Sequence, residues 1–221
     1  INRIENKTCN YRDLISLFQS ISQLEILKKL FLESPFKFNA SSKNIKKLIT
    51  FLSKAIDTEI LADNQSKLPV RKGFNKDFDE LILLKYESNS SLLSLESEEK
   101  SNTGINNLKI SYNRVFGYYF EVTKSNLQLV PKYFIRRQTL ANSERYYTEE
   151  LKQLEEKILN ADERISILED LIFNQICDEI SKYKADILLM SNDVSIIDSI
   201  YSFYLISNNN KWIKPILSND K

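Results

Sequence analysis

The sequence predicts a mainly α-helical protein. A helical core would give rise to a long antiparallel pair of helices, and a small antiparallel β-sheet would sit at the tip of that arm. Three observations predict this fold. Only three Gly and four Pro occur among 221 residues, so few positions interrupt helices. Long segments repeat Leu and Ile every three or four residues, which is typical of one helix face. One segment, 105–147, instead alternates polar residues with Tyr, Phe and Val, as strands do.

The first part of the predicted core is 1–75. A helix is expected over 11–33 and should end before Pro35, and Ser41 or Ser42 can cap a second helix. Residues 61–75 are expected to form a loop with a short extended piece at 69–71. The second helix would turn one apolar face inward, formed by Ile45, Leu48, Ile49, Leu52 and Ile56.

The arm is predicted from an outgoing helix over 76–104 and a returning helix over 148–184. The returning segment alternates apolar steps of three and four residues, the spacing of a heptad seam. Thr148 is a plausible start for it. Two interpretations remain open for this segment: one strand of an antiparallel coiled arm with the outgoing helix, or a long core helix in a bundle. The seam consists of Leu151, Leu154, Ile158, Ala161, Ile165, Leu168 and Ile172.

Between the two helices, residues 105–147 are expected to form the sheet. The first two strands would meet at a tight turn at Asn113–Arg114. Residues 133–140 and 144–147 are two further candidate strands. The final segment, 185–221, is expected to return to the core as a helix whose apolar residues pack on the first helices: Ile187, Val194, Ile197, Ile200, Tyr201 and Tyr204.

Charge is distributed unevenly along the chain. The net charge is +1, but residues 105–147 contain seven basic and two acidic residues, a balance of +5. The remaining residues contain 24 basic and 28 acidic residues, a balance of −4. Lys and Arg among Tyr, Asn, Gln, Thr and Ser suit contact with a phosphate backbone. A solvated basic face without a partner is the alternative. The tip has no recognition helix, RNP pattern or Cys/His finger, so binding of duplex DNA independent of base sequence is predicted.

Composition argues against an enzyme. The absence of His excludes His-based acid–base catalysis and nearly all zinc sites. Cys9 and Cys177 are far apart in sequence and are expected to be reduced thiols. Gly73, Gly104 and Gly117 cannot form a phosphate-binding loop. No apolar run is long enough for a membrane span, so we expect no membrane association and a soluble intracellular protein. Because the chain begins at Ile1, we also expect it to be a piece of a longer protein.

One long run resembles the clamp of the MutS family of DNA mismatch repair proteins. It begins YNRVFGYYFEVTKSN at Tyr112, continues through YFIRRQTLANSERYY and ends in TEELKQLEEKILNADERI at Ile165. The segment PVRKGFNKDFDEL resembles the family's entry into the outgoing lever helix. The segment NYRDLISLFQSISQLEIL resembles a helix of its core domain. The resemblance covers nearly the whole chain and implies the boundaries core 1–75, lever 76–104, clamp 105–147, lever 148–184 and core 185–221.

The resemblance implies a role and partners. The clamp would bind double-stranded DNA through backbone phosphates, with no catalysis and no cofactor in this chain. ATP and Mg would belong to an ATPase domain of the parent protein, which would act as a homodimer, with a MutL-type repair partner possible. Localisation would be cytoplasmic and DNA-associated, or organellar if the protein is organelle-encoded. The alternative function is a coiled-coil arm that binds another protein and no nucleic acid. The implied DNA-binding residues are Lys124, Ser125, Asn126, Arg136, Arg137, Gln138, Thr139 and Asn142.

Strand geometry and charge add two expectations about these residues. Alternation would place Arg136 and Gln138 on one face of the third strand, with Arg137 and Thr139 on the other. At least one of the two arginines would then serve structure. Pairing of Arg137 with Glu121 or Glu144 is one such role. The aromatic residues Phe116, Tyr118, Tyr119 and Phe120 are expected to form the core of the tip rather than a base-stacking surface.

Overall fold

The computed structural model describes residues 1–31, 33–58 and 69–214. The chain divides into two compact units, which we call unit 1 (residues 1–71 and 172–221) and unit 2 (residues 72–171). The fold is mainly helical with one four-stranded antiparallel sheet, which confirms the predicted fold class. Helix α5 (Glu149–Ser181) contributes residues to both units. None of the helices in the described part of the chain is long and apolar enough to cross a membrane.

Unit 1 contains α1 (Asn2–Glu5), α2 (Tyr11–Leu30), α3 (Ser42–Ala55) and α6 (Lys184–Asn209), together with the last turns of α5. Asn10 and Asp13 form a reciprocal capping box at the start of α2. Ser41, one of the two candidates, caps α3 by accepting a hydrogen bond from the Asn44 backbone N–H. The inner face of α3 is buried through Ile45, Leu48, Leu52 and Ala55.

The loop that joins the two units lies partly outside the described residues, which lack 59–68. After it, Val70 forms an isolated antiparallel bridge with Ile56. This bridge agrees with the short extended piece expected there.

Helix α6 packs on the rest of unit 1 only in its first half. Asp193 is fully buried and accepts hydrogen bonds from the Asn39 backbone, the Asn39 side chain and the Ala40 backbone. In the second half, Ile200, Tyr201 and Tyr204 are 57%, 57% and 60% exposed, so the prediction that they pack on the first helices is wrong. Periodicity identifies an apolar face, but it does not specify which element covers that face.

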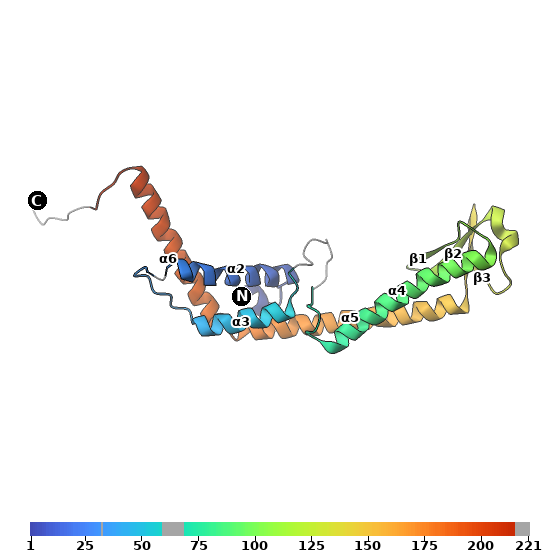
Figure 1. The fold of residues 1–221 in the computed structure, drawn as a ribbon, viewed down its shortest axis with the longest axis horizontal. Helices are drawn as coiled ribbons and strands as arrows, with labels where there is room; N and C mark the ends of the chain where they lie inside the picture. Colours follow the sequence, from blue (N-terminus) through green and yellow to red (C-terminus); the bar gives the residue numbers. More distant parts are fainter. Residues whose placement is uncertain (32, 59–68, 215–221) are drawn as a thin grey trace, which may run out of the picture. The chain divides into compact units, whose positions relative to one another are not determined.

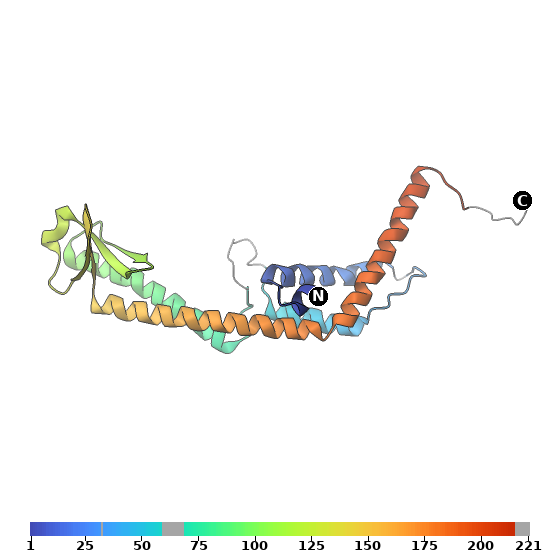
Figure 2. The ribbon, with the colours of Figure 1, turned by 180° about the vertical axis from the view of Figure 1, so that it is seen from behind.

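Unit 2 consists of α4 (Lys76–Thr103), the sheet and the first part of α5. Figures 1 and 2 show α4 (green) and this part of α5 side by side, with the sheet at their end. Asn75 caps α4, and Gly104 ends it in the left-handed conformation. The Thr148 hydroxyl accepts a hydrogen bond from the Leu151 N–H, as expected for the start of α5.

The predicted seam of α5 is buried except at Leu154 and Leu168, which are half-buried, and it contributes to both units. Leu151 and Ile158 share a core cluster with Leu92 and Leu95 of α4. Farther along, Lys85 and Asp162 form an ion pair at 2.6 Å between the two helices. From Ile172 onward the seam belongs to unit 1. The paired-arm interpretation therefore fits the first part of α5, and the core-helix interpretation fits its last turns.

The sheet has the strand order β1-β2-β4-β3, with β1 at Lys109–Asn113, β2 at Gly117–Thr123, β3 at Ile135–Thr139 and β4 at Ser143–Tyr147. The predicted turn lies between β1 and β2, where the Asn113 side chain accepts hydrogen bonds from the backbone N–H groups of Val115 and Phe116. Gly117 follows with a φ of 67°, and a Cβ there would overlap the Glu155 carboxylate. The left-handed backbone favours glycine here, and a larger residue would also displace the Glu155 side chain.

One face of the sheet forms a core with α4 and α5. Phe120 and Val122 of β2 are fully buried in it, beside Phe134 and Tyr146. The rings of Phe120 and Phe134 stack with centroids 5.0 Å apart. The expectation that the aromatic residues form the tip core is confirmed for Phe120, which is 0% exposed, and for Tyr118, which packs against the same cluster. Tyr119 is 5% exposed but lies on the opposite face of the sheet, under Arg145.

Candidate nucleic-acid interface

The predicted DNA-binding residues lie on three neighbouring pieces of unit 2. Lys124, Ser125 and Asn126 follow β2 and form the start of a 3-10 helix, η2 (Lys124–Leu129). Asn142 lies between β3 and β4, and the remaining four residues lie on β3.

The two loops are joined directly. The Lys124 backbone N–H donates to the Asn142 carbonyl at 3.1 Å. Both residues are exposed, as is Ser125, whose hydroxyl is 3.0 Å from that of Thr123. Two segments separated by the whole of β3 thus present a cation, a hydroxyl and an amide at one end of the sheet. Such a combination suits a phosphate group, which accepts hydrogen bonds from cationic and short polar donors.

Asn126 differs from these residues because its side chain has a structural partner. Its amide donates to the Asn107 side chain at 2.9 Å, and the residue is half-buried. This bond ties η2 to the segment before β1. Among the predicted loop residues, Asn126 is the least available to a ligand.

A bulge in β3 changes the predicted facing of its side chains. Arg136 pairs with Tyr146, but the next register pair is Gln138 with Arg145, which leaves Arg137 as the extra residue. The Arg136 side chain lies near Glu144, whereas the Gln138 side chain accepts a hydrogen bond from Arg145 on the other face. The prediction that Arg136 and Gln138 share a face is therefore wrong, because regular alternation does not continue through a bulge.

Each β3 arginine lies near one carboxylate. The Arg136 Nη1 is 3.8 Å from a Glu144 oxygen, and its side chain is 63% exposed. The Arg137 Nη1 is 3.8 Å from a Glu155 oxygen of α5, and its guanidinium lies 5.3 Å from the centre of the Tyr147 ring. The expected partners of Arg137, Glu121 and Glu144, are thus replaced by a residue from a helix. Both pairs are long, and exposed pairs of this kind contribute little stability.

Buried groups beneath β3 and β4 fix the position of Glu144. The Tyr146 hydroxyl donates a hydrogen bond to Glu144, and both residues are buried. Burial first, and this hydrogen bond second, raise the pKa of Tyr146 to about 12. Glu144 is therefore held by Tyr146, which leaves the Arg136 guanidinium only loosely engaged.

The opposite face of the sheet is tied by a second set of polar contacts. Arg145 lies 4.3 Å over the Tyr119 ring and donates to Gln138, and Ser143 donates to Glu121. The Gln138 side-chain oxygen is thus engaged by Arg145, which gives Gln138 a structural role. Thr139, at the end of β3, is exposed.

Four further cations belong to the tip but not to the predicted set of DNA-binding residues: Lys109, Arg114, Lys132 and Arg145. Arg114 and Lys132 are exposed and form no ion pair with the described residues. Lys124 shares this property. The sequence signal for this excess of cations is that residues 122–143 contain no Asp or Glu. The described part of the chain also contains no group of three His, Cys, Asp or Glu residues suited to a metal ion.

Comparison with known proteins identifies the family of this chain. Residues 73–164, which comprise nearly all of unit 2, match the model of MutS family domain IV. The chain is 41% identical over 215 residues to a "DNA mismatch repair protein MutS" of Caldicellulosiruptor saccharolyticus, a match that covers 96% of this chain. The chain belongs to the MutS family. A second MutS, from Thermodesulfovibrio yellowstonii, is 36% identical over 223 residues and 99% of the chain.

The chain corresponds to only part of these MutS proteins. It spans 25% of the Caldicellulosiruptor protein and 26% of the Thermodesulfovibrio protein. The match to domain IV falls on the helix pair and the sheet, while the likeness to whole MutS proteins extends through unit 1 as well. The resemblance stated from the sequence is therefore confirmed over almost the full chain.

Proposed function

We propose that unit 2 binds double-stranded DNA through its phosphate backbone, independently of base sequence. The observation that supports this proposal is the set of tip cations that no described carboxylate neutralises, Arg114, Lys124 and Lys132, beside the two loosely paired arginines. Lys124 lies next to the Asn142 loop, so a phosphate there would meet a charge and neutral donors together.

We extend this proposal to the longer protein of which the chain would be a part. By its family, it would be a mismatch repair ATPase that acts on DNA as a homodimer, with the nucleotide and Mg bound outside this chain and a MutL-type protein as a partner. It would act wherever its DNA is, in the cytoplasm or in an organelle. The arm formed by α4 and α5 would pass movements between clamp and ATPase, because a packed helix pair moves as a unit.

The test is a duplex-binding titration at several salt concentrations with two variants. Lys124→Glu with Lys132→Glu reverses two unpaired cations and leaves the ion pairs of β3 intact. Arg136→Gln with Arg137→Gln removes the arginine charges without placing new carboxylates beside Glu144 and Glu155. We expect weaker binding from both, and a slope of log affinity against log salt that falls by about 0.9 for each phosphate that the variant no longer neutralises.

The matched control reverses exposed cations elsewhere in unit 2. Lys152→Glu with Lys157→Glu changes the net charge of α5 by the same amount as the loop variant. A loss of affinity equal to that of the loop variant would show that only net charge matters. Unchanged affinity in both tip variants would overturn the proposal.

A protein-binding arm is the second candidate function. It is favoured by apolar side chains on the outer side of α4, where Leu83, Tyr86 and Leu93 are 56%, 73% and 71% exposed. Unchanged duplex binding in the tip variants, together with lost binding of a protein partner after Tyr86→Ser, would support this function instead.

A further inference from the structure

Unit 1 contains a second basic surface that the clamp does not explain. Residues 34–56 contain five lysines and no Asp or Glu. Four of these lysines, Lys43, Lys46, Lys47 and Lys54, lie on α3 and are exposed. This segment resembles 122–143 of the clamp, which is also free of carboxylates and contains four cations.

The helix gathers its lysines on one side. At about 100° per residue, positions 43, 46, 47 and 54 fall within an arc of about 100°, opposite the buried face of α3. Thr50 lies within the same arc, and these residues together line a shallow concavity on α3. The cations extend over about 16 Å of helix, given a rise of about 1.5 Å per residue. We call this surface the α3 lysine face.

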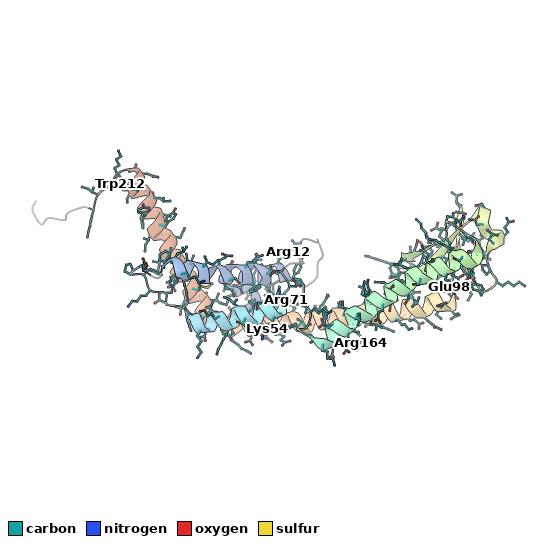
Figure 3. The ribbon with its side chains drawn as sticks, viewed as in Figure 1. Arg12, Lys54, Arg71, Glu98, Arg164 and Trp212 are labelled. Carbon is teal, nitrogen blue, oxygen red and sulfur yellow. The ribbon has the colours of Figure 1, made fainter. Side chains whose placement is uncertain are left out.

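Two cationic residues from neighbouring elements contact the two ends of α3, one through its side chain and one through its backbone. At its start, the Lys28 ammonium of α2 donates to the Ser42 hydroxyl at 2.8 Å. At its end, the Arg71 backbone N–H donates to the Ala55 carbonyl at 2.9 Å, and Figure 3 labels Lys54 and Arg71 at this end of the helix. Lys28 thus adds a cation beside the start of α3, and the backbone of Arg71 lies beside its end.

Two described carboxylates near the start of α3 are engaged by other groups. Asp186 accepts hydrogen bonds from the Ser41 backbone and the Asn44 side chain, and Asp193 binds Asn39 and Ala40. Among the described residues, no carboxylate lies within 4.0 Å of the ammonium groups of Lys43, Lys47 and Lys54.

Folding alone does not account for this charge. A cation in the last turn of a helix, such as Lys54, interacts favourably with the helix dipole. Lys43 lies in the first turn, where a cation is unfavourable and where α3 has no acidic residue of its own. Like charges spaced three or four residues apart also repel one another on a helix.

We propose that the α3 lysine face is a second contact for the phosphate backbone of duplex DNA, separate from the clamp. A row of single-sign charge matches a duplex strand, which carries one phosphate about every 3.4 Å along its axis. An acidic protein partner fits less well, because protein interfaces are depleted in Lys and enriched in aromatic residues and Arg. The exposed face has neither Arg nor Tyr nor Trp, and its aromatic residue, Phe51, is half-buried.

The test uses the whole chain with Lys43→Gln, Lys47→Gln and Lys54→Gln combined, since Gln keeps helix propensity and adds no new charge. Affinity for a duplex of about 20 base pairs is measured against salt, since counterion release makes the slope report how many phosphates are neutralised. We expect weaker binding and a slope reduced by up to ~2.7, because each phosphate left without its lysine lowers the slope by about 0.9. The thermal unfolding midpoint should not fall.

The matched control removes the same charge from exposed, scattered lysines of unit 1, with Lys7→Gln, Lys29→Gln and Lys211→Gln. An affinity and salt slope equal to those of this control would overturn the proposal. Loss of binding to poly-L-glutamate without loss of duplex binding would also overturn it, in favour of an acidic protein.

The clamp variant Lys124→Glu with Lys132→Glu separates this inference from the proposed function. An effect of the α3 variant without an effect of the clamp variant would support DNA binding at α3 and remove DNA binding at the clamp. An effect of the clamp variant without an effect of the α3 variant would support DNA binding at the clamp and overturn DNA binding at α3. Independent sites should give additive reductions of the salt slope when the two sets of substitutions are combined.

Discussion

Strands β2 and β3 belong to one sheet but differ in burial and in the number of strands with which they pair. The central strand β2 pairs with β1 and β4 and buries Phe120 and Val122 completely. The edge strand β3 pairs only with β4, and its burial pattern is mostly exposed. Cations on an edge strand also discourage pairing with another sheet. The comparison teaches that the two arginines predicted to bind DNA lie on an edge strand that contributes little to the core.

The largest expected effect comes from truncating a large apolar side chain in each of the two strands. Phe120→Ala in β2 should destabilise unit 2 by about 3–5 kcal/mol, because it leaves a cavity in the core. Ile135→Ala in β3, where the side chain is 40% exposed, should cost about 1 kcal/mol or less. The free energy of unfolding of both variants would be measured by titration with urea, with hydrogen exchange of the sheet amides as the probe. Equal costs would contradict the division of roles between the strands.

A smaller effect is expected at Tyr146, which lies between these strands on β4. Its pKa is raised from 10.0 to about 12 in the folded protein, first by burial and then by its hydrogen bond to Glu144. The unfolded chain therefore loses this proton at lower pH than the folded chain does. The contribution of this pKa shift to the free energy of unfolding should be fully present below pH 10. It should be lost as the pH rises from 10 to about 12.

Tyr146→Phe tests this dependence. The variant should lose about 1–3 kcal/mol at neutral pH, because Glu144 remains buried without its donor. Its stability should also fall less steeply above pH 10. Some dependence should remain, since the pKa of Tyr133 is also raised to about 12. An identical pH profile for the variant would show that the hydroxyl of Tyr146 does not link β4 to the pH response.

The sequence predicted features that depend on local chemistry. Helix starts followed from side chains that cap backbone N–H groups, as at Ser41 and Thr148. The central strand followed from its run of aromatic and β-branched residues, and the cationic tip followed from the local excess of Lys and Arg. Each of these signals lies within a few residues of the structure it specifies.

The features that the sequence did not predict depend on contacts between distant residues. The bulge at Arg137 has no marker in RRQT, because which residue is left over depends on the register with β4. The pair of Arg137 with Glu155 joins a strand to a helix that follows it in the chain. The exposure of Tyr201 and Tyr204 on α6 depends on what packs there, which an apolar pattern does not state.

The smallest expected effect is that of substituting Glu155, whose side chain lies near both β2 and β3. Its carboxylate lies against Gly117 at the start of β2 and 3.8 Å from Arg137 of β3. Glu155→Gln would keep the shape that packs on Gly117 and remove the charge that competes with phosphate for Arg137. We expect stability to change by less than about 1 kcal/mol, and duplex affinity to rise about two- to fivefold at low salt.

Loss of any carboxylate raises the net charge, so the affinity gain must be assigned to Arg137 by a double-mutant cycle. In an Arg137→Gln background, Glu155→Gln should raise duplex affinity distinctly less than it does in the wild-type chain. The difference between the two gains measures how strongly Glu155 restrains this arginine. An equal gain in both backgrounds would mean that Glu155 acts only through net charge. In that case Arg137 would belong with the structural residues of the clamp, and Arg136 and Lys124 would be the cations that bind phosphate.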